Sequence, residues 1–90
     1  MIKGKTESGF EYSMDEVVLD DFEVLELVGA VEESVTALPK LLAALFGDEQ
    51  KKAYYDHLRD PETKRVSTQK ILADVEKLFE DLGSADNTKN

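Results

Sequence analysis

The side chains best suited to chemistry in this sequence are one histidine, two adjacent tyrosines and several paired acids. His57 is the only histidine and cysteine is absent, so the chain holds no set of histidine and thiolate ligands for a metal. General acid–base catalysis needs a positioned partner beside the imidazole, and no such partner is evident around His57. We therefore interpret His57 as a packed or half-exposed residue of a helix.

No other motif in the sequence indicates catalysis. Tyr54 and Tyr55 would point about 100° apart on a helix, so at most one of them belongs to a core. The glycine patterns of phosphate-binding loops are missing. Three acid pairs could attract divalent cations loosely, but they lack the spacing and turn glycine of a calcium loop: Asp15-Glu16, Asp20-Asp21 and Glu32-Glu33. Without a nucleophile–base pair or a metal constellation, we predict no enzyme activity, no catalytic residue, no metal and no cofactor.

The charges of the chain are unevenly placed. Its formal net charge is −9. Ten acids and no base lie between Glu7 and Pro39, whereas ten acids and nine bases share the segment from Lys40 to Asn90. A strongly acidic segment repels nucleic acids and anionic membranes, and the basic footprint of a DNA- or RNA-binding protein is absent. The charge is compatible with a basic protein partner, with mimicry of DNA or with solubility alone.

The elements that position these residues are predicted to be mainly helical. Ninety residues make one domain, near the lower size limit for a single hydrophobic core. Apolar residues recur at three- and four-residue spacing, and capping residues, glycines or Asp60-Pro61 bound each run. This pattern predicts four helices, at 20–33, 36–46, 48–59 and 67–83.

The N-terminal segment favours a short strand. Phe10, Tyr12 and Met14 alternate with polar residues, which is the two-residue period of a strand. The turn at 6–9 could close a hairpin onto residues 2–5. The predicted fold class is therefore all-α: a small four-helix domain over residues 1–83 with a possible short N-terminal β-hairpin. We expect a disordered tail at 84–90.

The segment "ALPKLLAALFG" at 37–47 is the one strongly apolar stretch. Ten helical residues reach roughly 15 Å, which is half of the bilayer core of about 30 Å, so this stretch is not a transmembrane span. Nearly its whole circumference is apolar or small, which is typical of a helix that is buried on several sides or meets a partner. We predict a partner-binding face, with ordinary core packing as the alternative. The residues of that face are Leu38, Leu41, Leu42, Leu45 and Phe46.

Several short motifs, taken in order over about residues 10 to 82, resemble those of a known family. The motifs are Leu19-Asp20-Asp21-Phe22 with Leu25-Glu26, Leu38-Pro39 with Leu41-Leu42, Gly47 with Glu49-Gln50, and Leu58-Arg59-Asp60. The chain resembles the tail assembly chaperones of long-tailed, siphovirus-type bacteriophages and prophages of Gram-positive bacteria. It departs from the family pattern at one position, because relatives tend to have Gly-Arg-Val before the last helix and this chain has Lys64 in place of the glycine.

The resemblance implies a mostly helical, non-enzymatic protein of the bacterial host cytoplasm. Such a protein binds the tape measure protein and keeps it soluble during tail tube assembly. The tail tube protein is a further expected partner and a homo-oligomer is allowed, whereas nucleic acid and membrane are not expected as partners. Two other classes stay open: an acidic DNA mimic, and a helical adaptor that regulates a partner by binding.

Overall fold

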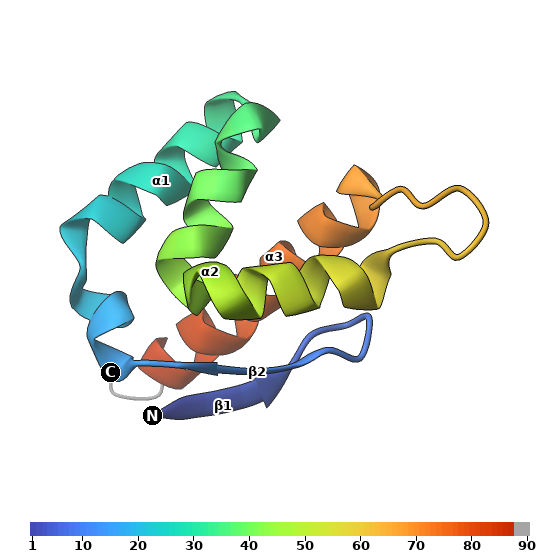
Figure 1. Ribbon diagram of the computed structural model, residues 1–90. Coiled ribbons are helices and arrows are strands. Elements are labelled where there is room, and N and C mark those ends of the chain that lie inside the picture. The colour runs from blue at the N-terminus through green and yellow to red at the C-terminus, as the bar shows by residue number, and fades with distance from the viewer. Residues whose placement is uncertain (88–90) are drawn as a thin grey trace.

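The structure is a computed structural model that describes residues 1–87, with side chains described as far as Leu82. A two-stranded antiparallel hairpin precedes three helices (Figure 1). The strands are β1 (Ile2–Lys5) and β2 (Glu11–Met14), and the helices are α1 (Phe22–Glu33), α2 (Leu38–Leu58) and α3 (Thr68–Asn87). Two short 3-10 helices, η1 (Glu16–Asp20) and η2 (Val35–Ala37), lead into α1 and α2. The hairpin runs beneath the C-terminal half of α2, and α3 passes behind it in Figure 1.

The predicted all-α class with four helices is wrong, because the domain has three helices and a hairpin that contributes to the core. The segments predicted as separate helices at 36–46 and 48–59 form one element, α2, which bends at Gly47. The backbone of Gly47 has φ 80° and ψ 165°, so the chain changes direction within one residue and no loop separates the two segments. We call residues 38–46 the first arm of α2 and residues 48–58 its second arm.

The N-terminal hairpin is present where the alternation predicts it. Its antiparallel register pairs Ile2 with Met14. The turn is closed by the Gly9 N–H, which donates to the Thr6 carbonyl at 2.9 Å, and Gly9 has a φ of 95° that glycine adopts without strain. Because Met14 is only 2% exposed, the hairpin is an integral part of the domain and not an appendage.

A glutamine from the second arm of α2 occupies the outer edge of β2. The Ser13 N–H donates to Gln50 Oε1 at 2.8 Å, and Gln50 Nε2 donates to the Ser13 carbonyl at 2.7 Å. The same amide nitrogen donates to the Phe46 carbonyl at 3.1 Å. An edge strand is a template for pairing with another strand, and here a side-chain amide satisfies that edge at Ser13.

Helix α1 differs from its prediction in its cap and in its inner face. Asp21 caps it instead of Asp20, since Asp21 Oδ1 accepts the Glu23 N–H at 2.8 Å. Val24 is buried, whereas Phe22 and Leu25, which belong to the same apolar repeat of this helix, are 70% and 63% exposed. Apolar residues surround much of this helix, so the periodicity alone does not select which of them meet the core.

Helix α3 begins as predicted and extends further. The Lys70 N–H donates to Ser67 Oγ at 3.3 Å, which is the expected N-terminal cap. The helix continues to Asn87, beyond the end predicted at Gly83. The tail predicted at 84–90 therefore overlaps this helix over 84–87, and its residues 88–90 lie outside the described part of the chain.

The core forms where the hairpin, both arms of α2 and α3 meet. At its centre the rings of Phe10, Phe46 and Tyr54 pack against one another, with centroids 5.1 to 6.2 Å apart. The buried apolar residues are Tyr12, Met14, Val24, Leu38, Leu41, Leu42, Leu45, Phe46, Tyr54, Leu58, Ile71, Val75 and Leu78. Strand β2 and all three helices of the described chain contribute to this list, whereas Ile2 of β1 is only partly buried against the core.

We predict opposite effects for alanine at two glycines. Gly47 and Gly29 both have open space where a Cβ would stand, so packing does not distinguish them. Gly47→Ala should lower the free energy of unfolding by about 1 to 3 kcal/mol, because its dihedral angles belong to a region that only glycine occupies readily. Gly29→Ala, inside α1, should raise it by about 1 kcal/mol. Urea unfolding measures both, and equal effects would contradict the bend at Gly47.

Candidate functional site

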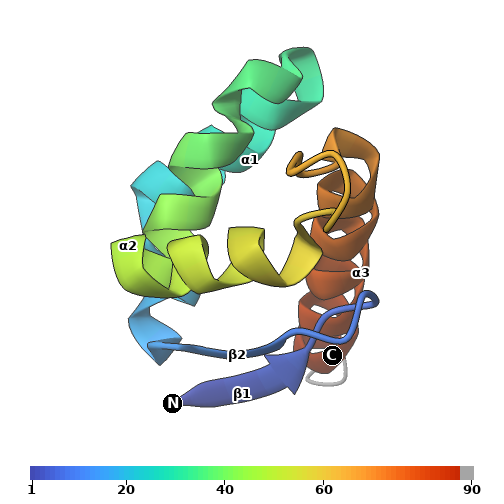
Figure 2. The ribbon, with the colours of Figure 1, turned by 45° about the vertical axis from the view of Figure 1, so that its right-hand side comes forward.

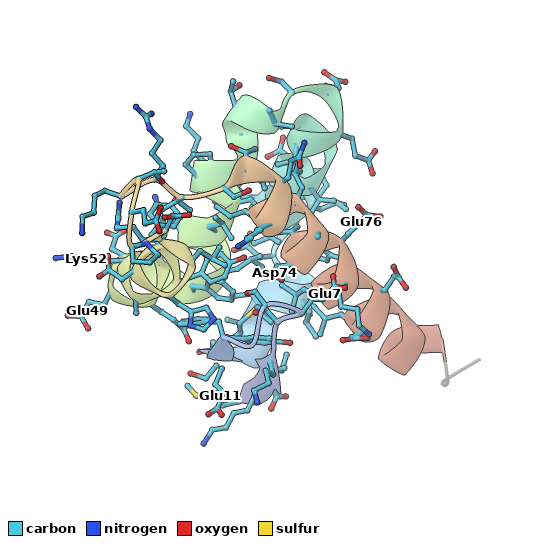
Figure 3. The ribbon with its side chains drawn as sticks, turned by 90° about the vertical axis from the view of Figure 1, so that its right-hand side faces the viewer. Glu7, Glu11, Glu49, Lys52, Asp74 and Glu76 are labelled. Atoms are coloured by element: carbon cyan, nitrogen blue, oxygen red, sulfur yellow. The ribbon has the colours of Figure 1, made fainter. Side chains whose placement is uncertain are left out.

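A buried cluster of polar side chains joins the hairpin turn, the second arm of α2 and α3. Asp74 on α3 is 3% exposed, and Figure 3 shows it on the inward side of the helix, with Glu76 on the outward side. Its Oδ1 accepts the Ser8 N–H at 2.9 Å, and its Oδ2 accepts the hydroxyls of Ser8 and Tyr54, each at 2.6 Å. These three donors from two other elements supply the hydrogen bonds that a buried carboxyl group needs.

The cluster contains the residue types of a hydrolytic triad in a geometry that does not activate the serine. The Ser8 hydroxyl gives its one hydrogen to Asp74, so the Thr6 hydroxyl donates to Ser8 Oγ at 3.0 Å. His57 Nε2 donates to the Ser8 carbonyl at 3.1 Å and makes no contact with the hydroxyl. A nucleophilic serine needs an imidazole that accepts its proton. The cluster therefore fastens the turn at residues 6–9 to α2 and α3.

Sequence reasoning missed Asp74, although the sequence carries a signal for it. Asp74 lies three residues after Ile71 and four before Leu78, in the middle of the apolar stripe of the last helix. An acid on a buried stripe must find hydrogen-bond donors, so its position alone points to a polar cluster. The tyrosine pair behaves as expected, because Tyr54 is fully buried and Tyr55 is half-buried.

The buried environment changes the acidity of the tyrosines. Burial raises the pKa of Tyr54 far above its usual value near 10, and the hydrogen bond to Asp74 and the charge of that group raise it further. Burial also raises the pKa of Tyr55, without a comparable hydrogen bond. The Tyr54 hydroxyl is therefore a hydrogen-bond donor over the physiological pH range.

The five residues predicted as a partner-binding face lie in the core. Their exposed fractions are between 1% and 9%, as found for Leu38, Leu41, Leu42, Leu45 and Phe46. Their burial agrees with the alternative interpretation of this stretch, which is ordinary core packing. In so small a domain the most apolar helix lies at the centre, because the other elements have no other large apolar surface to pack on. These residues therefore offer no exposed face, and the exposed apolar surface lies elsewhere.

An apolar groove runs between α1 and α3. Figure 2 shows the backbones of these two helices, with α3 on the right. One half has a volume of about 400 Å³ and the other of about 320 Å³. Val28 of α1 and Phe79 of α3 line both halves, so the two halves lie side by side along the helices. Leu41 and Leu45 of the predicted face form its buried floor. The other apolar lining residues are Val18, Leu19, Val24, Leu25, Val31, Leu72, Val75 and Leu82.

The charged residues that line the groove are all acidic. Asp21 and Glu32 stand at α1, and Glu76 and Glu80 stand on α3. Within the described residues none of the four forms an ion pair, and no lysine or arginine lines either half. The groove thus combines apolar walls with a negative potential at its rim. An apolar surface with an acidic rim suits a ligand that is both apolar and basic.

Tyr54→Phe tests the buried cluster through its pH dependence. The folded state keeps a proton on Tyr54 that the unfolded state loses above pH 10, so the stability that this proton provides is complete below pH 10 and declines above it. The decline is about 1.4 kcal/mol per pH unit for one such group. Urea unfolding above about pH 10 should therefore show a shallower decline in Tyr54→Phe than in the wild type.

Tyr55→Phe is the matched control for this measurement. Burial raises the pKa of Tyr55 less and without the hydrogen bond to Asp74, so this variant should flatten the decline less than Tyr54→Phe does. The same slope in Tyr54→Phe and in the wild type would contradict the role assigned to the Tyr54–Asp74 hydrogen bond.

Within residues 1–87, none of the three helices combines the length and the apolar character that crossing a membrane requires. The same part of the chain holds no group of three or more histidine and acidic side chains placed to bind a metal ion. No family model, no curated protein and no solved structure matches the sequence.

Proposed function

We propose that the protein is a tail assembly chaperone of a siphovirus-type bacteriophage or prophage. In this role it binds the tape measure protein and keeps it soluble in the cytoplasm of the bacterial host while the tail tube assembles. The observation that carries the proposal is the open apolar groove between α1 and α3. A protein that holds an apolar client in solution needs an accessible apolar surface, and this groove supplies one.

The charge of the chain supports the same role. A complex between a chaperone and an apolar client stays in solution when its outer surface is strongly charged. The net charge of −9 on 90 residues gives this chain such a surface. Half of the acids lie between Glu7 and Glu33, on the hairpin, η1 and α1, and two of them, Asp21 and Glu32, line the groove.

The one departure from the family pattern lies at a position with glycine-like geometry. Relatives tend to have glycine where this chain has Lys64, and Lys64 has a φ of 64°. Residues other than glycine seldom adopt this left-handed conformation, which costs roughly 1 kcal/mol. The Arg59 guanidinium donates to the Lys64 carbonyl at 3.0 Å and holds the loop in this shape. The backbone here is therefore compatible with the family pattern despite the substitution.

The groove also helps to distinguish the chaperone from the two alternative functions, an acidic DNA mimic and a helical adaptor. A DNA mimic presents arrays of carboxyl groups and has no use for an apolar groove, so the groove favours a protein partner. A regulatory adaptor could use the same groove. The genes beside this one distinguish the adaptor from the chaperone, because a tail tube gene on one side and a very long coiled-coil gene on the other favour the chaperone alone.

Co-expression with the neighbouring tape measure protein tests the proposed function. We expect the wild-type chain to increase the soluble fraction of this client several-fold over expression of the client alone. Leu25→Asp should reduce that effect, because Leu25 lines the groove and its 63% exposure allows the change without loss of the fold. Leu42→Asp would be uninformative, since Leu42 is 1% exposed and its replacement should unfold the domain.

Val17→Asp is the matched control. Val17 is 68% exposed and does not line the groove, so this variant should protect the client as well as the wild type does. A client that stays insoluble beside the wild-type chain would contradict the proposed function.

A further inference from the structure

We propose that the groove between α1 and α3 binds one amphipathic helix whose apolar stripe is flanked by lysine or arginine residues. This inference rests on the proposed function in one respect, since there the helix is a segment of the tape measure protein. The chemistry of the ligand, however, follows from the groove itself. Three features of the groove restrict the kind of ligand that can bind: its length, its half-buried apolar walls and the negative charge of its rim.

The groove has the length of a short helix. Along α1 its lining runs from Asp21 to Glu32, and along α3 from Leu72 to Leu82. Eleven or twelve helical residues extend about 15 to 17 Å, which is about three turns. A third helix laid between two others can insert the residues that recur at i, i+3, i+4 and i+7. Small-molecule sites usually enclose most of their ligand, whereas this groove is only partly enclosed.

The walls of the groove consist of apolar side chains that the fold covers only in part. Val28 and Val31 on α1 and Leu72 and Phe79 on α3 are half-buried and pack against the edge of the core. Leu25, at one end of the groove, is largely exposed. An incoming apolar stripe would remove these surfaces from water together, which is the main driving force for such docking.

The rim of the groove sets the charge of the ligand. Glu76 and Glu80 lie one turn apart on α3, and Glu32 stands on α1, on the other side. Like charges one turn apart on a helix repel each other, and within the described residues these acids have no basic partner in an ion pair. Cations beside the apolar stripe of a bound helix would pair with both rims. The same geometry would repel a helix with acidic flanks.

Two labelled peptides of about 15 residues test this inference without any client protein. Both carry the same leucine stripe at i, i+3, i+4 and i+7, and their flanking positions are all lysine in one and all glutamate in the other. Fluorescence anisotropy at low salt should give a Kd at least about tenfold lower for the lysine peptide. The double variant Glu76→Lys with Glu80→Lys should reverse this order. Both glutamates are exposed, so the fold should persist.

The control is Glu49→Lys with Glu62→Lys, which makes the same change in net charge away from the groove. Glu49 lies on the second arm of α2, on the other side of the molecule from Glu76 (Figure 3). This control should still prefer the lysine peptide. Equal affinities of the wild type for both peptides, or the same reversal in the control, would overturn the inference. Dimerisation of the chain through the groove would also overturn the inference. Sedimentation would then show a dimer of the wild type and a monomer of the double variant Glu76→Lys with Glu80→Lys.

The peptide experiment and the client experiment distinguish a failure of the groove inference from a failure of the proposed function. If the wild type protects the client but neither peptide preference appears, the groove inference is wrong and the proposed function stands. If the lysine peptide binds and reverses as expected but the client stays insoluble, the groove inference stands and the proposed function is wrong.

Discussion

The fold depends on one buried carboxyl group. Asp74 accepts hydrogen bonds from the Ser8 N–H, the Ser8 hydroxyl and the Tyr54 hydroxyl, and these bonds join α3 to a turn 66 residues earlier in the chain and to the second arm of α2. Removing one partner would leave a buried polar group unsatisfied, which costs about 1 to 3 kcal/mol in a domain whose total stability is small. This cluster therefore fixes how the hairpin turn, α2 and α3 meet, beside the apolar core that the same elements share.

The groove follows from how the helices are held. The inward face of α3 packs against the hairpin and the second arm through Asp74 and its apolar neighbours. The face that carries Glu76 and Phe79 is therefore available for other contacts. Helix α1 packs on the first arm instead, which Gly47 turns away from the second. Two partly covered helix faces therefore flank an opening floored by Leu41 and Leu45. The bend at Gly47 and the fastening at Asp74 together create the surface to which we assign the client.

Much of the secondary structure can be predicted from the sequence, and the site cannot. Capping residues and spacing locate the hairpin, α1, both arms of α2 and the start of α3 within about two residues, because these signals are local. They do not predict η1, and they end α3 too early. That Gly47 joins two segments into one bent helix depends on how they pack, which periodicity does not report. The apolar stretch around Leu42 looks like a binding face and lies in the core, whereas Leu25 looks like core and is exposed. The groove joins residues about 50 positions apart, so only the tertiary structure reveals it.

The central claim is that a client helix binds between α1 and α3. Methyl NMR spectra of the free chain and of the chain purified in complex with the tape measure protein that we propose as its client test this claim most directly. We expect the largest shift changes at Val28, Val31 and Leu72, which line the groove, and little change at Leu58 and Val66, which do not. Changes concentrated at Leu58, Val66 or the hairpin, with the groove methyls unmoved, would contradict the account.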